Sequence, residues 1–351
     1  MPKKKTTGLV LQGGGALGAF EYGVIRRLYE EPGFVPDVIS GVSIGAVNAA
    51  CLAGARGEPV QTLGTLWEAL CLPTMPLLPP QVTRMAALFG NPSFFTMRLD
   101  YAALPFWTSF YDTDSLRPLL EKCIDFEKLN SRDNPIKLLL SATNIRTGQI
   151  ETFDNRRDQI TPDHILASGS LPPGFPMTPV NGVEYWDGGL FNNTPLQPVI
   201  EELDEGPDVR LYVVNLFPNQ GKIPQNMMDV LGRMFAIQFS NKLIMDVNTA
   251  TKVNVFTRLV DFIDAGLTEQ AKKKLEKDPS LSDVKAMYAK LKSYKDIQNI
   301  VMIVNEEPEP VFGPFDFSRQ SIESRIGWGY EAATHQLAKP RPARKPQAQP
   351  R

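Results

Sequence analysis

The chain has 351 residues, and its 37 basic and 39 acidic side chains leave a formal net charge of −2. A charge this close to zero provides no general attraction for nucleic acid. No run approaches the ~20 apolar residues of a membrane-spanning helix. Residues 1–5 are basic but lead into glycines, so we expect no signal peptide. The three cysteines are odd in number and have no metal-binding spacing, which favours reduced thiols and a cytoplasmic protein.

A strand, a glycine loop and a helix are predicted at the start of the chain. Residues 8–11 are an apolar run, Gly13-Gly14-Gly15-Ala16-Leu17-Gly18 follows, and residues 19–31 have helical spacing. Successive amides of such a loop favour a bound anion. The loop also fits the dinucleotide pattern Gly-x-Gly-x-x-Gly, which requires an acidic residue at the end of the next strand. Asp37 instead begins the strand predicted over residues 35–39, so the dinucleotide interpretation is disfavoured.

A serine turn follows that second strand. Gly41-Val42-Ser43-Ile44-Gly45 has the form Gly-x-Ser-x-Gly, the strand-to-helix turn that presents a serine nucleophile. The small apolar residues 46–53 predict a helix packed closely on a sheet. Ser43 would then lie at a helix N-terminus, where backbone amides favour negative charge. The β-α-β-α order predicts an α/β fold with a parallel sheet.

The middle of the chain continues this pattern around one unusual segment. Residues 72–111 are rich in proline, methionine and aromatic side chains, and they either pack over the sheet or form a lid or lipid-contact insertion. Strands are predicted over residues 136–144, 149–153, 183–186 and 209–216, and helices over residues 116–124, 163–169 and 195–203, the last with Thr194 as its N-cap.

The composition changes after Gly221. Two amphipathic helices are predicted over residues 228–239 and 243–264, two charged helices over residues 270–277 and 284–294, a strand over residues 300–304 and a final helix over residues 318–338. We therefore expect a basic tail at residues 1–6, an α/β domain at residues 7–220, a mainly helical extension at residues 221–338 and a disordered tail at residues 339–351.

Ser43 requires a general base. The chain has only two histidines, His164 and His335, and the order Ser43, acid, His335 keeps a Ser-Asp-His triad as a formal alternative. Asp187, in Asp187-Gly188-Gly189, is the better candidate because a strand delivers it to a tight turn. Apolar neighbours on both sides would desolvate its carboxylate and make it a stronger base.

The transition state also requires an oxyanion site. The amides of Gly14 and Gly15, on the loop after the neighbouring strand, are the first candidates, and the Ile44 amide adds to them. The alternative is a glycine turn that only lets the helix and the strand pack closely.

Together, the glycine loop, Gly41-Val42-Ser43-Ile44-Gly45 and Asp187-Gly188-Gly189 resemble the motifs of the patatin-like phospholipases, as does Ala167-Ser168-Gly169-Ser170-Leu171-Pro172. The resemblance covers roughly residues 7–216. It implies a three-layer α/β/α fold with a mostly parallel central sheet and a Ser43–Asp187 dyad without histidine, metal or cofactor. The oxyanion hole implied lies in the glycine loop and helix start (Gly13, Gly14, Gly15, Gly18 and Ile44), and the motif glycines are Gly41, Gly45, Gly188 and Gly189.

The resemblance further implies hydrolysis of acyl esters of phospholipids or lysophospholipids, with peripheral membrane contact and without nucleic acid. Many family members carry Arg or Lys where this chain has Leu17, so esterase chemistry is better supported than phospholipid preference. The segment Phe315-Asp316-Phe317-Ser318-Arg319 resembles an extension of some bacterial members. The rival hypothesis is a non-catalytic module that binds lipids or a protein through residues 72–111 and the Met-rich helices.

Overall fold

The computed structural model describes residues 6–72, 90–206, 208–218, 220–221, 223–225, 227–295, 297, 299–307 and 313–339. Most of the tail predicted at residues 1–6, residues 73–89 of the segment 72–111 and nearly all of the tail predicted at residues 339–351 lie outside these described residues.

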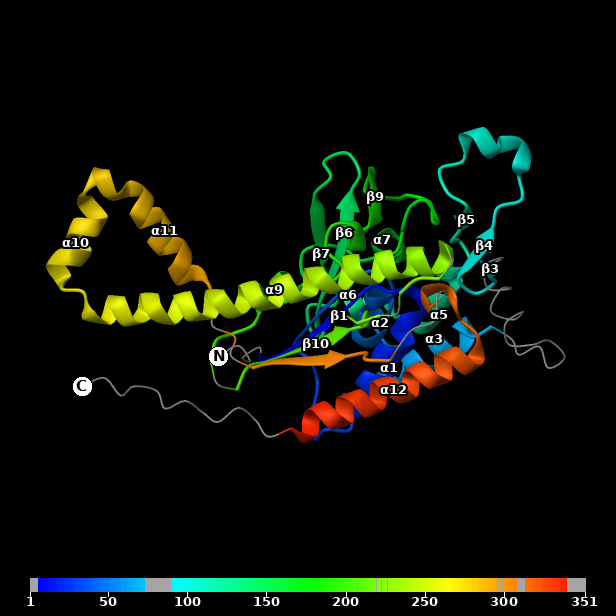
Figure 1. The fold of residues 1–351 in the computed structure, drawn as a ribbon, viewed down its shortest axis with the longest axis horizontal. Helices are drawn as coiled ribbons and strands as arrows, with labels where there is room; N and C mark the ends of the chain where they lie inside the picture. Colours follow the sequence, from blue (N-terminus) through cyan, green and yellow to red (C-terminus); the bar gives the residue numbers. More distant parts are fainter. Residues whose placement is uncertain are drawn as a thin grey trace.

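One sheet forms the centre of the molecule (Figure 1). Its strands are β1 (Thr7–Leu11), β2 (Val38–Gly41), β6 (Lys137–Asn144), β7 (Ile150–Asp154), β8 (Thr178–Val180), β9 (Val183–Asp187), β10 (Arg210–Asn215) and β11 (Ile300–Val304). They lie in the order β11-β10-β1-β2-β6-β9-β8, and β7 pairs with β6. The run from β11 to β6 is parallel, whereas β7, β8 and β9 join it in antiparallel pairs. The predicted mostly parallel sheet is confirmed.

Helices flank the sheet and fill the connections. They are α1 (Gly18–Tyr29), α2 (Ile44–Ala53), α3 (Pro59–Leu70), α5 (Leu116–Cys123), α6 (Phe126–Asn130), α7 (Pro162–Ser168), α8 (Leu196–Glu202), α9 (Met227–Gly266), α10 (Glu269–Lys277), α11 (Ser282–Ser293) and α12 (Arg319–Ala338). Short 3-10 turns are η1 (Gly15–Leu17), η3 (Tyr101–Phe106), η4 (Gly188–Leu190), η5 (Pro279–Leu281) and η6 (Gly313–Phe315). Among the described residues, no helix combines the length and the apolar character needed to cross a membrane.

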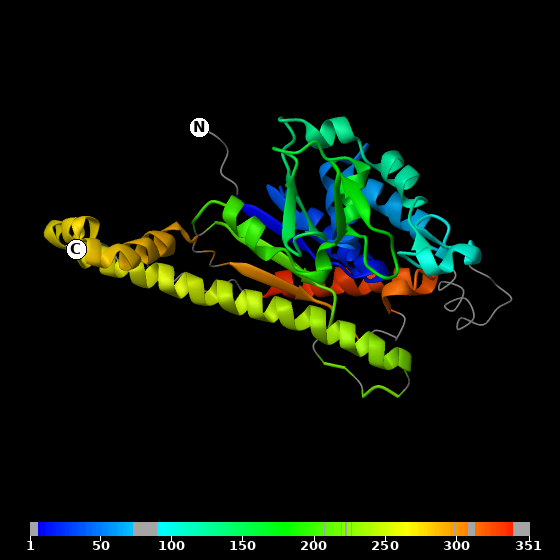
Figure 2. The ribbon, with the colours of Figure 1, turned by 90° about the horizontal axis from the view of Figure 1, so that it is seen from above.

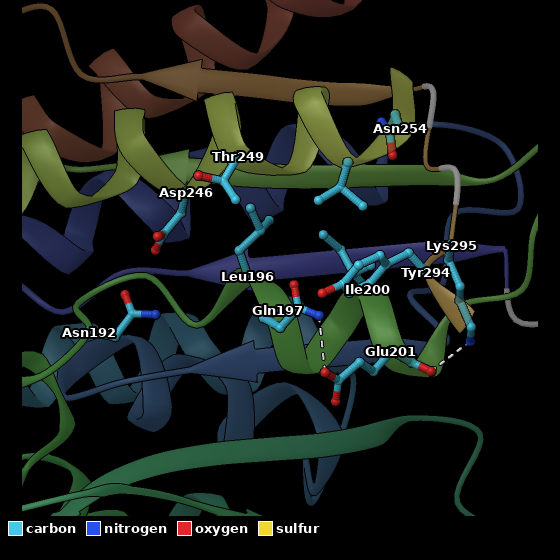
Figure 3. Close-up of a pocket in the computed structure, with 11 residues that line it drawn as sticks. Asn192, Leu196, Gln197, Ile200, Glu201, Asp246, Thr249, Asn254, Tyr294 and Lys295 are labelled. Atoms are coloured by element: carbon cyan, nitrogen blue, oxygen red, sulfur yellow. Dashed lines mark hydrogen bonds between the residues drawn. The ribbon is translucent and has the colours of Figure 1, made fainter. Parts of the chain in front are cut away.

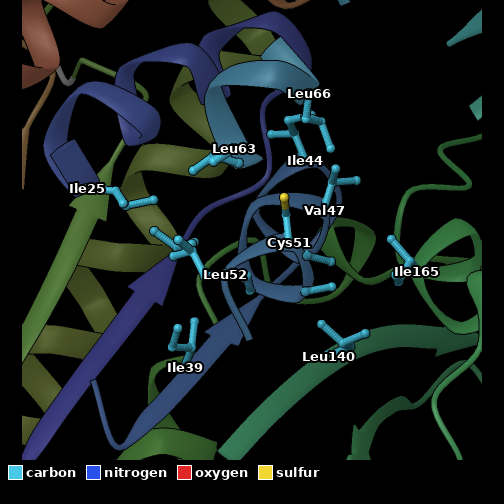
Figure 4. Packing of buried hydrophobic residues seen from close by; sticks show 14 of the residues in the cluster. Ile25, Ile39, Ile44, Val47, Cys51, Leu52, Leu63, Leu66, Leu140 and Ile165 are labelled. Atoms are coloured by element: carbon cyan, nitrogen blue, oxygen red, sulfur yellow. The ribbon is translucent and has the colours of Figure 1, made fainter. Parts of the chain in front are cut away.

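Alternation along β1 shows how the layers form. Leu9 and Leu11 belong to a large core that also contains buried side chains of α1, α2, α3 and α12, whereas Val10 belongs to a smaller core with α8 and α9. Figure 4 shows part of the larger core, where Cys51 and Leu52 of α2 lie among apolar side chains of neighbouring elements. Helices therefore cover both faces of the sheet (Figure 2), and the predicted three-layer α/β/α fold is confirmed.

Three local predictions are corrected. The helices predicted over residues 228–239 and 243–264 are one helix, α9, of 40 residues, because residues 240–242 contain neither glycine nor proline to end it. Thr194 caps no helix. α8 begins at Leu196, and the Thr194 hydroxyl accepts a hydrogen bond from the Gln12 side chain at 2.9 Å. The strand predicted from residue 35 begins at Val38.

The segment after Gly221 divides into two parts. β11 extends the central sheet next to β10, and α12 packs along α1. Before β11 in the chain, the end of α9 projects away from the sheet with α10 and α11 (Figures 1 and 2). We call residues 255–293 the arm. A smaller sheet of β3 (Gly90–Asn91), β4 (Phe95–Met97) and β5 (Tyr111–Asp112) lies at the opposite end of the molecule.

Candidate active site

Ser43 occupies a strained turn between β2 and α2. Its φ is 54°, in the left-handed region that a non-glycine residue rarely adopts. A Cβ at Gly45 would lie 2.5 Å from the carbonyl oxygen of Leu11, and one at Gly41 would lie 2.2 Å from the carbonyl oxygen of Gly45. Both obstacles are backbone atoms, so side chains at these positions would force the turn away from β1. The two motif glycines therefore let the serine turn close.

The end of α7 holds the backbone of this turn. The Ser43 amide donates to the Ser168 carbonyl at 3.0 Å and lies 3.1 Å from the Ser168 hydroxyl oxygen. That hydroxyl donates to the carbonyl oxygen of Ser141 at 2.7 Å. Ser43 is the N-cap residue of α2, but its side chain caps no helix amide. An N-cap serine usually accepts such a bond, so the hydroxyl is left available for other chemistry.

Asp187 lies next to the serine. β9 ends at this residue, whose carbonyl accepts a hydrogen bond from the Thr143 hydroxyl at 3.0 Å. Its buried carboxylate accepts a hydrogen bond from the Gly189 amide at 2.7 Å, and Ser43 lines the same cavity. Burial raises the pKa of Asp187 from 3.8 to about 7, and the Gly189 amide and the nearby Ser43 hydroxyl oppose that rise. A carboxylate with a pKa near neutrality suits a general base at physiological pH.

The glycine loop faces the same cavity as Ser43 and Asp187. Gly13, Gly14, Gly15 and Ile44 line one cavity together with Ser43 and Asp187. Within the described part of the chain, the amides of Gly14, Gly15 and Ile44 have no hydrogen-bond acceptor. Three unpaired donors beside a serine hydroxyl have the composition of an oxyanion site.

Two of the predicted loop residues use their amides elsewhere. The Gly18 amide donates back to the carbonyls of Gly15 and Ala16, and Gly18 does not line the cavity. A Cβ at Gly18 would lie 2.6 Å from the Ile44 side chain, so this glycine lets α1 pack against α2. The Gly13 amide donates to the Asn193 carbonyl at 3.3 Å. The amides of Gly13 and Gly18 are thus already paired, and an oxyanion role for these two glycines stays a prediction.

The cavity has a volume of about 100 Å³, and apart from the glycine loop, Ser43, Asp187 and Asn193 its lining is almost entirely apolar. Its wall is mostly aromatic and comes from segments far apart in the sequence: Phe94, Phe95, Leu171, Phe175, Phe217, Phe239, Pro314, Phe315 and Phe317. The rings of Phe94 and Phe317 are 5.5 Å apart, in an edge-to-face arrangement. An apolar wall beside a nucleophile fits an acyl chain better than a charged head group.

Residues 314–317, near the C-terminus, thus contribute to the cavity. The sequence analysis did not predict this contribution. Gly15 has a φ of +56°, and a Cβ there would lie 2.3 Å from the carbonyl oxygen of Pro314. η6 therefore lies directly on the glycine loop. Its sequence carries no chemical motif, and the only available signal was the aromatic pair Phe315 and Phe317.

Sequence analysis also missed Asn193, which connects two of the motifs. Its side-chain amide donates to the Gly13 carbonyl at 2.9 Å, and its own carbonyl accepts from the Gly13 amide. Asn193 is buried, six residues after Asp187. The pair of bonds holds the glycine loop to the turn that carries the base. An asparagine four residues after the Asp-Gly-Gly turn was the signal available in the sequence.

A buried carboxylate lies behind the glycine loop. Glu21 of α1 accepts hydrogen bonds from the Gln12 amide at 2.6 Å and from the Asn48 side chain at 2.8 Å. The Trp67 indole donates to the Asn48 side-chain oxygen at 3.0 Å, which fixes the orientation of that amide. Burial raises the pKa of Glu21 to about 8. The network connects the residue before Gly13 with α2, the helix that begins after Ser43.

Neither histidine reaches the site. His164 is buried in the first turn of α7, where its ring pairs with Thr161 in a capping box and packs 4.7 Å from the Phe153 ring. His335 is exposed in the last turn of α12. Neither is among the residues that line the cavity.

A larger cavity, of about 440 Å³, lies between α8 and α9 (Figure 3). It is lined by polar and apolar side chains, among them Gln197, Glu201, Asp246 and Lys295. The Lys295 ammonium donates to the backbone carbonyl of Glu201 at 2.6 Å, so one of its hydrogen-bond donors is already used within the protein. This cavity contains neither Ser43 nor Asp187, and its size alone does not make it the reaction site.

Comparison with known proteins agrees with this geometry. A family model described as patatin-like phospholipase matches residues 9–200. Lysophospholipase nte1 of Aspergillus terreus is 34% identical over 116 residues, which is 30% of this chain and 7% of that relative. The chain therefore spans only a small part of the length of that relative.

Two solved structures were also found to be similar. VipD from Legionella pneumophila has 16% identity and a TM-score of 0.42, covering 95% of this chain and 67% of VipD. The ExoU–SpcU complex of Pseudomonas aeruginosa has 18% identity and a TM-score of 0.32, covering 82% of this chain and 60% of the matched chain. The family model spans more than half of the chain and includes the glycine loop, Ser43 and Asp187, so the chain belongs to the patatin-like phospholipase family.

Proposed function

We propose that this protein is a serine hydrolase of lipid acyl esters, of the phospholipase A or lysophospholipase type. The observation that carries the proposal is that Ser43 and the buried Asp187 line one cavity with an aromatic wall. Membership of the patatin-like phospholipase family and the similarity to a lysophospholipase support the same chemistry.

The reaction would run in two halves. Asp187 takes the proton of the Ser43 hydroxyl as the Ser43 oxygen attacks the ester carbonyl. The amides of Gly14, Gly15 and Ile44 stabilise the negative oxygen of the tetrahedral intermediate. The C–O bond to the alcohol or lysolipid then breaks, and Asp187 returns the proton to the leaving oxygen. In the second half, Asp187 takes a proton from water as the water oxygen attacks the acyl-enzyme carbonyl. The C–O bond to Ser43 then breaks, Asp187 returns the proton to the Ser43 oxygen, and the fatty acid leaves.

The substrate class follows from the side chains around the dyad. Among the described residues that line the cavity there is no lysine, arginine or histidine. Leu17, at the position where many family members carry a basic residue, is buried and outside the cavity. The described lining therefore suits an acyl chain and offers no cation to a phosphate, so we expect tolerance of different head groups.

Fatty-acid release from phospholipids, lysophospholipids and short-chain esters tests the proposal. The wild-type protein should release fatty acid from at least one lipid class, and Ser43→Ala should abolish that release because no nucleophile remains. The rival hypothesis, a non-catalytic lipid-binding module, predicts a different result. The wild-type protein would then bind lipid, hydrolyse none of these esters and fail to react with a fluorophosphonate.

A further inference from the structure

An exposed hairpin extends from the aromatic wall of the cavity. We call residues 98–110, between β4 and β5, the finger; they contain η3 (Figure 1). In Figure 1 the finger stands away from the body of the molecule, at the end opposite the arm. Its base is part of the site, because Phe95 of β4 and the preceding Phe94 line the cavity.

The finger is fastened to a second part of the cavity wall. The Phe110 amide donates to the Pro173 carbonyl at 3.0 Å, and the Tyr111 amide donates to the Gly174 carbonyl at 2.9 Å. The neighbouring residues Leu171 and Phe175 also line the cavity. Both ends of the finger are thus joined to elements that form the wall beside Ser43, so its orientation relative to the cavity is set by backbone hydrogen bonds.

The finger exposes large apolar side chains to an unusual degree. The exposed fraction is 85% for Phe106, 73% for Leu99 and 61% for Tyr101, and Leu104 and Phe110 are also exposed. Residues 101–110 contain no charged side chain. Arg98, the first residue of the finger, lies over the Trp107 ring at 5.0 Å and pairs with Asp100 at 2.8 Å, which neutralises it locally. Exposed Phe, Tyr and Leu without net charge match the interfacial region of a bilayer.

The size of the cavity indicates why such a surface would be needed. A volume of about 100 Å³ is several-fold smaller than the roughly 300–1,000 Å³ of sites that enclose a whole small molecule. The cavity holds the acyl segment next to the reacting carbonyl, and the remainder of a lipid must stay outside the protein. A bilayer surface held against the mouth of the site would keep that remainder in an apolar environment.

From these contacts we propose that the finger is the membrane-docking element of this enzyme and inserts Leu99, Tyr101 and Phe106 into the surface of a phospholipid bilayer. This inference rests on the proposed lipid hydrolase function. The occupant is a lipid surface because the finger is continuous with the acyl cavity. Attraction is hydrophobic and not electrostatic, so neutral phosphatidylcholine should suffice.

Vesicle flotation tests the inference, with the Ser43→Ala chain used so that no lipid is consumed. This chain should float with phosphatidylcholine vesicles, and adding Phe106→Asp should weaken the apparent affinity about tenfold or more, the equivalent of one large apolar side chain left in water. Phe262→Asp is the matched control. Phe262 is also a phenylalanine, 79% exposed, but it lies in the arm at the other end of the molecule. The Phe262→Asp substitution should leave flotation unchanged.

Salt and lipid charge provide a second readout. Flotation should persist from about 0.1 M to about 0.5 M salt, where surface charge interactions are largely screened. Equal loss of binding in the Phe106 and Phe262 variants, unchanged binding in Phe106→Asp, or binding that requires anionic phosphatidylglycerol and disappears with salt would each overturn the inference. So would a chain that does not float with any of these vesicles.

Activity on two substrates separates this inference from the proposed function. Phe106 does not line the cavity, so Phe106→Asp should hydrolyse a water-soluble short-chain ester like the wild type while losing about tenfold in rate on vesicles. No hydrolysis of either substrate by the wild type would overturn the proposed function and leave the flotation result to decide on docking. Equal rates of the two proteins on vesicles would overturn docking and leave the hydrolase intact.

Discussion

The loops around Ser43 and the arm use the same kinds of residue in opposite ways. At the active-site loops, residues 13–18, 41–45 and 187–193, the polar groups that position the loops are paired: Asp187, Asn193 and the amide of Gly13 all have partners within the site. In the arm, apolar groups are exposed, with Val255, Phe256, Leu259 and Phe262 between 49% and 79% accessible. The active-site loops depend on backbone positions being held to a fraction of an ångström, whereas the arm depends mainly on helix formation.

The comparison predicts that an added methyl group is destructive in one region and tolerated in the other. Gly45→Ala would place a Cβ 2.5 Å from the Leu11 carbonyl oxygen, which cannot move without distorting β1. We expect loss of soluble folded protein or destabilisation of several kcal/mol. Gly266→Ala at the end of α9 meets no atom within 4 Å and should have little effect. Thermal unfolding of the two variants measures the difference, and equal melting temperatures would contradict this distinction.

The buried base predicts that activity and stability change with pH in opposite directions. Asp187 must lose its proton to act, so the acylation rate should rise through about pH 7 and then level off. Its pKa in the folded state is above its ordinary 3.8, so the folded protein binds more protons than the unfolded chain between those values. The free energy of unfolding contributed by this group therefore falls as pH rises from about 4 to about 7.

Asp187→Asn removes that titration. Relative to the wild type, the variant should gain stability as pH rises across this window, by up to about 4 kcal/mol. Urea unfolding at pH 4.5 and pH 7.5 measures the change. A stability difference between the two proteins that does not depend on pH would mean that the carboxyl is not buried as described.

A smaller loss of stability is expected from changing Glu21, which lies behind the glycine loop. In Glu21→Gln, one acceptor oxygen becomes an amide donor, which must face either the Gln12 amide or the Asn48 side chain. One buried donor is then unpaired, at a cost of about 1–3 kcal/mol. Because Gln12 precedes the oxyanion glycines, kcat should fall more than KM changes, which steady-state kinetics on a soluble ester can detect. A melting temperature and kcat equal to those of the wild type would exclude a positioning role for Glu21.

The smallest change in the free energy of unfolding is expected from a substitution in the arm. Phe262→Ser removes an apolar side chain that is 79% exposed, so the free energy of unfolding should change by about 0.5 kcal/mol or less. Chemical denaturation measures this. A loss above about 2 kcal/mol would show that the side chain is covered in the folded protein and that the contrast between the two regions is overstated.

The same contrast explains how much could be predicted from the sequence. Gly41, Gly45 and the Asp187 turn were recognisable because close backbone approach excludes every side chain, which leaves a sequence pattern. Seven strands of the central sheet, β1, β2, β6, β7, β9, β10 and β11, were recognisable from short apolar runs, to within about three residues, whereas β8 and the small sheet of β3, β4 and β5 were not predicted. Asn193, Glu21 and η6 were missed because their partners are distant in sequence and no local rule requires their residue types. The continuity of α9 was missed because an amphipathic pattern does not reveal whether its helices are joined.

The central claim, that Asp187 and not a histidine activates Ser43, is tested most directly by fluorophosphonate labelling with the modified residue mapped by mass spectrometry. The wild type and His335→Ala should be labelled on Ser43 at the same rate. Asp187→Asn should be labelled roughly 10²–10⁴-fold more slowly, the usual contribution of a general base. Normal labelling of Asp187→Asn together with loss of labelling in His335→Ala would contradict the account and establish the histidine triad instead.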